Sequence, residues 1–195
     1  MSDKRTINAY TNRVSDYLSM PLPAEQIEAR QAFADAVGKG GYVLDLGSGP
    51  GSDSAFLMRQ GLKVRALDAT PAFVEHAKNN GVNAYLGTFD DVTEVAEYDG
   101  VYASFSLLHA PRADFPRHLA AIHAALKPGG RLFLGMKLGT GEHRDHLDRY
   151  YTYYSRTEIE EALTDAGFTV DGAVTGMGKG LAGSYDGFIV VSAHA

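Results

Sequence analysis

Three glycines at alternate positions, Gly47, Gly49 and Gly51, follow the apolar run Val43–Leu46. Glycine permits the sharp turn that this spacing implies, and it lets a ligand lie directly against the backbone. The run before the glycines predicts a short buried strand, and residues 52–60 after them predict a helix. A glycine turn between a parallel strand and a helix N-terminus is where an open α/β sheet binds a nucleotide-like ligand.

Two nucleotide-like ligands compete for such a turn, a dinucleotide such as NAD and S-adenosylmethionine. The dinucleotide fingerprint places its third glycine three positions after the second, where this chain has Ser52. Asp45, just before the turn, suits the free ammonium group of S-adenosylmethionine and repels the pyrophosphate of a dinucleotide. Both features favour S-adenosylmethionine over NAD.

A second acid, Asp68, ends the next predicted strand in the run ALDAT. A carboxylate there can accept hydrogen bonds from both hydroxyls of a ribose, which both candidate ligands contain. The alternative role for Asp68 is to cap the helix predicted for residues 71–79, but Thr70 is better placed for that role. We therefore expect Asp68 to bind the ribose.

An α/β sheet has to position these residues. Turn and periodicity signals predict an N-terminal helix or ordered arm at residues 7–18, then helices at 24–37, 52–60, 71–79, 112–126 and 155–165. They predict strands at residues 43–46, 63–67, 82–86, 101–107, 131–136, 168–175 and 187–193. The alternation favours a parallel sheet covered on both faces, and the short connection between the last two strands favours an antiparallel pair at its edge.

The composition excludes several classes of protein. A chain of 195 residues suits one domain with its own core, and its formal charge of -6 gives no general attraction for nucleic acid. The N-terminus has no apolar signal region, and no stretch approaches the ~20 apolar residues that span a bilayer. The absence of cysteine suits the cytoplasm. We expect a cytoplasmic protein with no nucleic-acid or membrane partner; the oligomeric state stays open.

From about residue 40 onward, the ordered motifs resemble those of the class I S-adenosylmethionine-dependent methyltransferases. The segment DLGSGPG (residues 45–51) resembles their first motif, LDAT (67–70) the second and GTFDDV (87–92) the third. YDGVYASFSLLHAPR (98–112) resembles the fourth, and LKPGGRLFLGMK (126–137) the strand that follows it. The resemblance implies an α/β fold, a Rossmann-like three-layer sandwich whose seven-stranded sheet has the order 3-2-1-4-5-7-6 with strand 7 antiparallel. Residues 1–38 would form a helical arm or lid and residues 39–195 the core of a single methyltransferase domain.

By the same resemblance, the cofactor S-adenosyl-L-methionine would lie along these motifs. Asp45, Gly47 and Gly49 would line its methionine end, Asp68 would bind the ribose, and Phe89 with Ala69 would contact the adenine faces. Similar sequences often carry an acid where this chain has Thr88, and either Asp90 or Asp91 replaces that acid or caps the short helix that follows. The full expected cofactor-binding set is Asp45, Gly47, Ser48, Gly49, Asp68, Ala69, Thr88, Phe89, Asp90, Ser104 and Tyr17.

Methyl transfer from a sulfonium is an in-line displacement, so the protein mainly aligns the acceptor and excludes water. Ser106 and His109 would lie beside the methyl group, where His109 either takes a proton from the acceptor or bonds a nearby carbonyl. Tyr10 and Tyr17 would cover the cofactor or pack against the sheet. Arg13 between them either meets a carboxylate or stays solvated. The expected catalytic residues are His109, Tyr10 and Ser106.

The polar segment 138–154 predicts a loop beside the ligand edge of the sheet. His143 and His146, with Asp145 and Asp148, have spacing that invites a metal, but no cysteine assists, the segment is not clearly helical and methyl transfer needs no Lewis acid. We therefore expect no metal site. We expect the loop to form a wall of the acceptor pocket, with Arg149, Tyr150 and Tyr153 as possible contacts.

These interpretations predict an enzyme that transfers a methyl group to a small-molecule acceptor. The alternatives are a non-catalytic module or partner subunit that binds S-adenosylmethionine and, third, an NAD-dependent oxidoreductase. The sequence does not distinguish among oxygen, nitrogen, sulfur and chalcogen acceptors.

Overall fold

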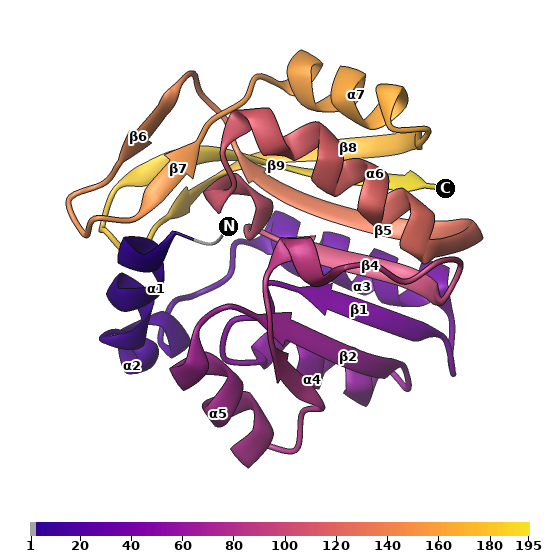
Figure 1. Cartoon of the computed structure of the whole chain (residues 1–195), viewed down its shortest axis with the longest axis horizontal. Helices are drawn as coiled ribbons and strands as arrows, with labels where there is room; N and C mark the ends of the chain where they lie inside the picture. Colours follow the sequence, from indigo (N-terminus) through magenta and orange to yellow (C-terminus); the bar gives the residue numbers. More distant parts are fainter. Residues whose placement is uncertain (1–2) are drawn as a thin grey trace.

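One seven-stranded sheet runs through the computed structural model, which describes residues 3–195 (Figure 1). The strand order is β3-β2-β1-β4-β5-β9-β8. The five strands from β3 to β5 are parallel, and β9 is antiparallel to both β5 and β8. This confirms the expected order 3-2-1-4-5-7-6, in which only the last strand of the sheet along the chain, here β9, is reversed. The strands are β1 (Tyr42–Leu46), β2 (Lys63–Asp68), β3 (Ala84–Leu86), β4 (Tyr98–Ser104), β5 (Leu126–Lys137), β8 (Thr169–Lys179) and β9 (Tyr185–His194).

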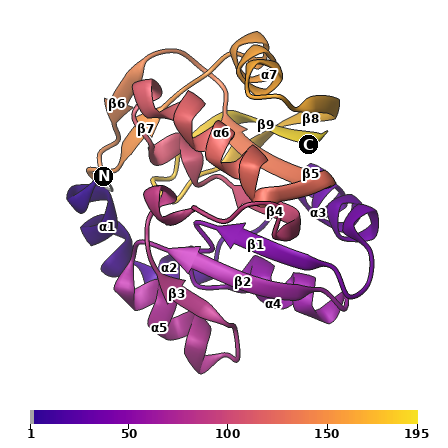
Figure 2. The same cartoon turned by 45° about the vertical axis from the view of Figure 1, so that its right-hand side comes forward.

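Helices cover both faces of this sheet and give three layers (Figures 1 and 2). On one face, Phe33 of α3 (Ala24–Val37) and Leu57 of α4 (Ser52–Arg59) share a buried cluster with Val43 of β1. On the other face, α6 (Phe115–Ala125) and α7 (Arg156–Asp165) pack on a larger cluster that includes Leu44. Val43 and Leu44 point to opposite faces of the sheet, so β1 is buried on both faces, as a central parallel strand requires. The remaining helix of the sandwich, α5 (Pro71–Asn79), packs along β2 and β3.

The N-terminal arm consists of two short helices, α1 (Lys4–Thr11) and α2 (Val14–Leu18), in place of the single helix expected for residues 7–18. The break lies at Arg13, whose φ of -137° and ψ of 31° are not helical. The Arg13 guanidinium is used locally, since it donates to the Ala9 carbonyl at 3.1 Å. Figure 1 shows the arm at the edge of the molecule where the central parallel strands end, which makes it a cover for that edge.

The polar segment 138–154 contains a two-stranded hairpin, so the expected loop is corrected. Its strands are β6 (Glu142–Arg144) and β7 (Tyr150–Thr152), paired antiparallel. The free edge of β7 is held by the arm, because the Tyr150 N–H donates to the Thr6 hydroxyl oxygen at 2.9 Å. Asp3 and Arg144 form a two-bonded ion pair across the same junction, at 2.6 and 2.9 Å. The hairpin and the arm thus support each other.

Several expected boundaries shift for local reasons. Strand β4 ends at Ser104, and Leu107 instead begins the 3-10 turn η2 (Leu107–His109), because Phe105 adopts a left-handed φ of 54° that ends the extended chain. A second 3-10 turn, η3 (Arg112–Asp114), precedes α6. The helix expected at residues 155–165 begins with a capping box: the Ser155 hydroxyl accepts from the Glu158 N–H, and the Glu158 carboxylate accepts from the Ser155 N–H. Within residues 3–195, no helix is long and apolar enough to cross a membrane.

Candidate functional site

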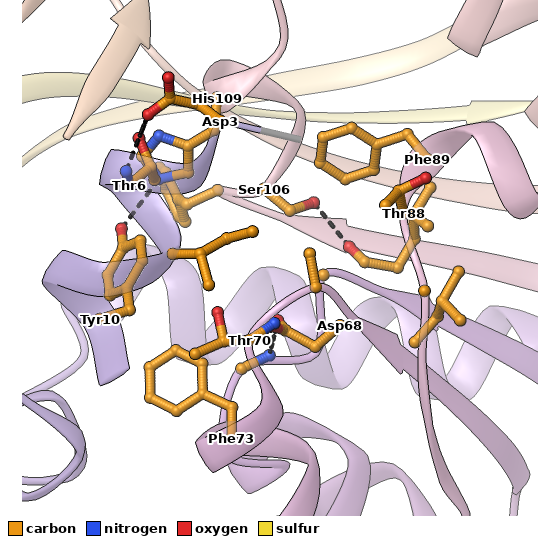
Figure 3. Close-up of a pocket in the computed structure, with 18 of the residues that line it drawn as sticks. Asp3, Thr6, Tyr10, Asp68, Thr70, Phe73, Thr88, Phe89, Ser106 and His109 are labelled. Carbon is orange, nitrogen blue, oxygen red and sulfur yellow. Dashed lines mark hydrogen bonds between the residues drawn. The ribbon is translucent and has the colours of Figure 1, made fainter. Parts of the chain in front are cut away.

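A cavity opens at the carboxyl ends of β1, β2 and β4, beneath the N-terminal arm (Figure 3). It encloses about 710 Å³ including its mouth, within the range of small-molecule sites. We call it the first cavity. The arm, the glycine turn and the segments after β2, β3 and β4 all contribute to its lining, which consists of Asp3, Thr6, Ile7, Tyr10, Tyr17, Leu46, Gly47, Gly49, Leu67, Asp68, Ala69, Thr70, Phe73, Gly87, Thr88, Phe89, Ser104, Phe105, Ser106 and His109.

Asp68 ends β2 with its carboxylate in the floor of the first cavity. One carboxylate oxygen accepts from the Gly49 N–H at 2.8 Å, and the other accepts from the Thr70 N–H at 2.7 Å. Burial raises the pKa of this carboxyl, while the two backbone donors oppose that rise. The Thr70 hydroxyl also hydrogen-bonds this carboxylate. Because a hydroxyl can rotate to another acceptor, the fixed carboxylate can still accept two hydrogen bonds from a ligand.

The glycine turn is shaped by close contact with the segment after β4. A Cβ atom added to Gly47 would lie 2.2 Å from the Ser106 Cβ, and the φ of Gly47 is +75°. The Ser106 hydroxyl donates to the Leu46 carbonyl at 2.6 Å and fastens the two segments together. Gly49 lies directly under Tyr17, whose ring would be 3.5 Å from an added Cβ. The turn therefore presents bare backbone to the cavity, as a ligand lying against it requires.

The opposite end of the first cavity is formed by Thr88 and Phe89. Thr88 caps the 3-10 turn η1 (Phe89–Asp91), and the Asp91 carboxylate accepts from the Thr88 N–H at 2.7 Å. Asp91 therefore caps this turn, which is one of the two roles that the sequence left open for it. Asp90 forms an ion pair with Arg117 at 2.7 Å. The cap fixes the backbone that presents the Phe89 ring to the cavity.

A hydrogen-bond network joins Tyr10 on the arm to His109 on η2. His109 Nδ1 lies 2.5 Å from the Tyr150 carbonyl, which can only accept, so Nδ1 carries the proton and Nε2 is the acceptor. The Tyr10 hydroxyl then donates to His109 Nε2 at 2.8 Å (Figure 3). The Tyr10 oxygen accepts from Arg149 Nη1 at 3.1 Å and also bonds the Tyr151 hydroxyl. In this arrangement His109 and Tyr10 have no free lone pair for an acceptor proton, so both hold the arm closed.

Burial lowers the pKa of His109 to about 4, so the imidazole is neutral near pH 7. The unfolded chain binds this proton near pH 6.5, so it carries more protons than the folded chain between pH 6.5 and 4. Stability must therefore fall as the pH falls through that window, by at most about 3 kcal/mol from this group. We expect His109→Gln, which keeps an acceptor for Tyr10, to flatten the fall measured by denaturant unfolding at pH 7, 6, 5 and 4.5. An unchanged slope in His109→Gln would assign the pH dependence to other groups.

Most of the site residues expected from the sequence meet in this one cavity. Those that line it are Tyr10, Tyr17, Gly47, Gly49, Asp68, Ala69, Thr88, Phe89, Ser104, Ser106 and His109. For the described residues 3–195, the lining does not include Asp45, Ser48 or Asp90. Asp90 pairs with Arg117, and the Ser48 hydroxyl is buried without a hydrogen-bond partner among residues 3–195.

Asp45 lies one layer behind the glycine turn. It is 2% exposed, and the Ser54 hydroxyl donates to its carboxylate at 2.5 Å. Burial first, and then the charge of Asp53, raise the pKa of Asp45 to about 8. Its side chain faces α4 because β1 alternates its faces, and the sequence could show the acid but not the face. Asp45 therefore lies behind the glycine turn, bonded to α4, and does not line the cavity.

A second cavity adjoins the first and shares Tyr10, Tyr17 and Phe105 with it. It encloses about 1080 Å³ including its mouth and lies among the end of the arm, the hairpin β6–β7 and the tip of β8–β9. The expected wall residue Arg149 lines it, whereas Tyr150 and Tyr153 do not within residues 3–195. The Tyr150 hydroxyl bonds Glu142, and the Tyr153 ring stacks on His143.

Two residues that line these cavities, Phe105 and Phe73, were not expected from the sequence. Phe105 belongs to both linings, and its left-handed φ of 54° is rare for a bulky residue. Strain of this kind clusters at functional sites. Phe73, at the start of α5, packs on Tyr10 and Tyr17 with ring centroids 5.6 and 5.3 Å away. Neither has a local sequence signal, since their roles depend on partners distant in the chain.

The two acids Asp145 and Asp148 of the polar segment are engaged in ion pairs with arginines. Asp145 pairs with Arg149 at 2.6 Å, and Asp148 pairs with Arg5 at 2.5 Å. The described part of the chain, residues 3–195, contains no group of three histidine or acidic side chains placed to hold a metal ion.

Comparisons with known proteins add independent findings. Residues 43–130 match the family described as methyltransferase domain. Hemagglutinin 1 of Eikenella corrodens is 26% identical over 138 residues, which is 62% of this chain and 46% of that protein. The ubiquinone biosynthesis O-methyltransferase of Xanthomonas oryzae pv. oryzae strain PXO99A is 31% identical over 122 residues, 58% of this chain and 48% of that protein. The chain spans about half the length of the curated relatives it matches.

Among solved structures, the fold is similar to that of 1,6-didemethyltoxoflavin-N1-methyltransferase from Burkholderia thailandensis, crystallised with 1,6-didemethyltoxoflavin and S-adenosylhomocysteine. The TM-score is 0.76 at 24% identity, over 96% of this chain and 84% of that one, so the likeness is one of fold. The matched domain begins in β1 and contains the glycine turn, Asp68 and Phe89. Residues 43–130, less than half of the chain, thus match a methyltransferase domain, and the sheet as a whole has the Rossmann-like methyltransferase fold.

Proposed function

We propose that this chain transfers a methyl group from S-adenosylmethionine to a small-molecule acceptor. The observation that carries the proposal is the pair of adjoining cavities: one has the ribose-binding carboxylate, the aromatic face and the bare glycine turn, and the other shares a wall with it. Relatives whose names state a small-molecule methyl acceptor support this acceptor class. As the composition predicts, we place the reaction in the cytoplasm.

The residues of the first cavity fit the chemistry of the cofactor. Asp68 can accept hydrogen bonds from two ribose hydroxyls, and Phe89 offers a ring face to the adenine. Gly47 and Gly49 line the cavity without side chains, so the backbone of the turn is open to a ligand. Asp53 and Asp68 both raise the pKa of Asp45, and a cationic ligand at that end would relieve this repulsion between acids. When bound, S-adenosylmethionine supplies a methyl group on a sulfonium, which a lone pair of the acceptor displaces in line.

The protein's own part is alignment and exclusion of water. Tyr10 and Tyr17 cover the cavity from the arm, packed edge to face with ring centroids 5.8 Å apart. The His109 and Arg149 bonds hold Tyr10 in that place, so these are positioning residues in the closed arrangement. Ser106 fixes the segment after β4 against the glycine turn. A rigid cover of this kind holds reactants in a near-attack geometry and keeps water out.

Calorimetry with S-adenosylhomocysteine tests the cofactor half of the proposal, with NAD as the competing ligand. We expect binding of S-adenosylhomocysteine and none of NAD. Incubation with S-adenosylmethionine and a panel of small acceptors tests the transfer half, through formation of S-adenosylhomocysteine. Binding without turnover against any acceptor would indicate a non-catalytic module, and binding of NAD alone would indicate an oxidoreductase.

A further inference from the structure

We propose that the acceptor carries an anionic group, such as a carboxylate, on an apolar or aromatic body, and that Lys137 binds this group in the second cavity. The inference rests on the proposed function, because it assigns the acceptor of the same reaction. It names a substrate class and a binding residue that the fold alone does not give.

The charges that face the second cavity differ in sign from those of the whole chain. The formal charge of the protein is -6, yet three cations line this cavity, Lys137, Arg149 and Lys179, against two carboxylates, Asp53 and Asp186. Two of these charges are neutralised from outside the cavity, Asp53 by Arg30 at 2.6 Å and Arg149 by Asp145 at 2.6 Å, which leaves two cations against one carboxylate. The lining therefore leaves an excess of positive charge in an acidic protein, and such a cleft attracts anions.

Two of the three cations have capacity for a ligand. Lys179 is exposed and has no carboxylate within 4 Å among residues 3–195. Lys137 bonds Asp186 at 2.5 Å and lies 4.6 Å from the centroid of the Tyr151 ring. An ammonium group has three donors, so the Lys137 Nζ retains one for a ligand in the cavity. Its side chain is only 14% exposed, so a bond made there is shielded from water.

Arg149 contributes charge without being free to move. Its guanidinium bonds Asp145 through Nε at 2.9 Å and Nη2 at 2.6 Å, and it bonds the Tyr10 hydroxyl. The side chain is 3% exposed. It thus anchors the wall between the two cavities, and Lys137, beside it over the same Tyr151 ring, is the better placed anion ligand.

The remaining walls of the second cavity are apolar. The end of α2 and the link after it supply Leu18, Met20 and Pro21, and Leu108 and Phe188 also belong to the lining. An apolar body would be buried between these walls while its acidic group reaches the cationic end. A small hydrophilic acid would leave this surface wet, so the walls favour an aromatic or otherwise apolar acid.

The competing explanation is that the cations serve the carboxylate of the cofactor's methionine end. The two cavities share a wall, so this explanation needs its own measurement. Methylthioadenosine lacks the amino-acid portion of S-adenosylhomocysteine, so a cation that binds the cofactor's carboxylate would change the affinity for one and not for the other.

The test uses 2-naphthoate and its neutral isostere 2-naphthamide, titrated calorimetrically into protein saturated with S-adenosylhomocysteine. We expect the acid to bind wild type about tenfold tighter than the amide, the factor that one charge-assisted bond supplies. In Lys137→Met, which keeps the shape without the charge, this preference should fall to less than about threefold. The matched control is Lys63→Met, an exposed lysine at the start of β2, which should keep the full preference.

Other outcomes are decisive in the opposite direction. Equal binding of acid and amide by wild type, no binding of either, or a full preference retained in Lys137→Met overturns the inference. A loss of affinity in Lys137→Met for S-adenosylhomocysteine but not for methylthioadenosine assigns the cation to the cofactor and also overturns it. Failure of the proposed function is seen separately, as absence of S-adenosylhomocysteine binding by wild type.

Discussion

Replacement of Asp68 by alanine is expected to weaken the binding of S-adenosylhomocysteine by about 100-fold or more. Two charge-assisted hydrogen bonds to the ribose would be lost, each of which contributes about 1.5–3 kcal/mol. The Gly49 and Thr70 N–H groups would also lose their acceptor, so the glycine turn would be held less firmly. Calorimetric titration at pH 7.5 gives the two dissociation constants directly.

A second variant separates binding from folding. Asp68→Asn keeps the shape of the side chain but must point its amide donor at one of the two backbone N–H groups, so it should weaken binding by a similar factor. The control is Asp35→Asn, because Asp35 lies exposed on α3 and bonds Gln31 there. Its affinity should equal that of wild type. If Asp68→Ala binds S-adenosylhomocysteine as tightly as wild type while remaining folded, the ribose role is refuted.

The parts of the fold that the sequence predicted well are those set by local signals. The helix at 24–37 has the predicted bounds because Pro23 precedes it and Gly38 ends it with a φ of +79°. The capping box of Ser155 and Glu158 lies within four residues and needs no distant partner. The order of the sheet, in contrast, came from the resemblance of ordered motifs, since periodicity alone identifies strands without arranging them.

The parts that the sequence missed depend on long-range contacts. The strands β6 and β7 are three residues each, too short for a clear alternation. They form because Thr6 and Asp3, more than 140 positions earlier, hold their far edge. The arm breaks at Arg13 for the same kind of reason, since α1 and α2 must each place a tyrosine over Phe73. No window of sequence contains both sides of these contacts.

The candidate site shows the same division. Gly47, Gly49 and Asp68 carried motif spacing and do line the first cavity. Asp45 carried the same motif signal but faces α4, because the direction of its side chain depends on the pleat of β1. Lys137 lay in a recognised motif as an ordinary strand end, and only the fold brings it beside Arg149 and Tyr151. Motifs thus locate the first cavity, whereas the second cavity is assembled from segments that are distant in the chain.

Replacement of Gly47 by alanine is expected to cause the largest loss of stability of any single substitution in the glycine turn. The new Cβ would lie 2.2 Å from the Ser106 Cβ, and the φ of +75° disfavours any side chain. Gly129→Ala is a matched control, because Gly129 has a φ of +77° with nothing within 4 Å of the added Cβ. The backbone term alone costs about 1–2 kcal/mol. The contact should add about 3 kcal/mol in Gly47→Ala, a further fall of about 6–12 °C in Tm.

A double substitution tests whether the clash with Ser106 is the cause. Ser106→Gly removes the Cβ that Gly47→Ala would meet, at the cost of the hydroxyl bond to the Leu46 carbonyl. If the clash dominates, the double variant should be more stable than the sum of the single effects predicts, by at least about 1 kcal/mol. Additive effects, or equal losses in Gly47→Ala and Gly129→Ala, would mean that the segment after β4 yields to the new methyl group. The contact with Ser106 would then not require glycine at position 47, and only the positive φ of that residue would require it.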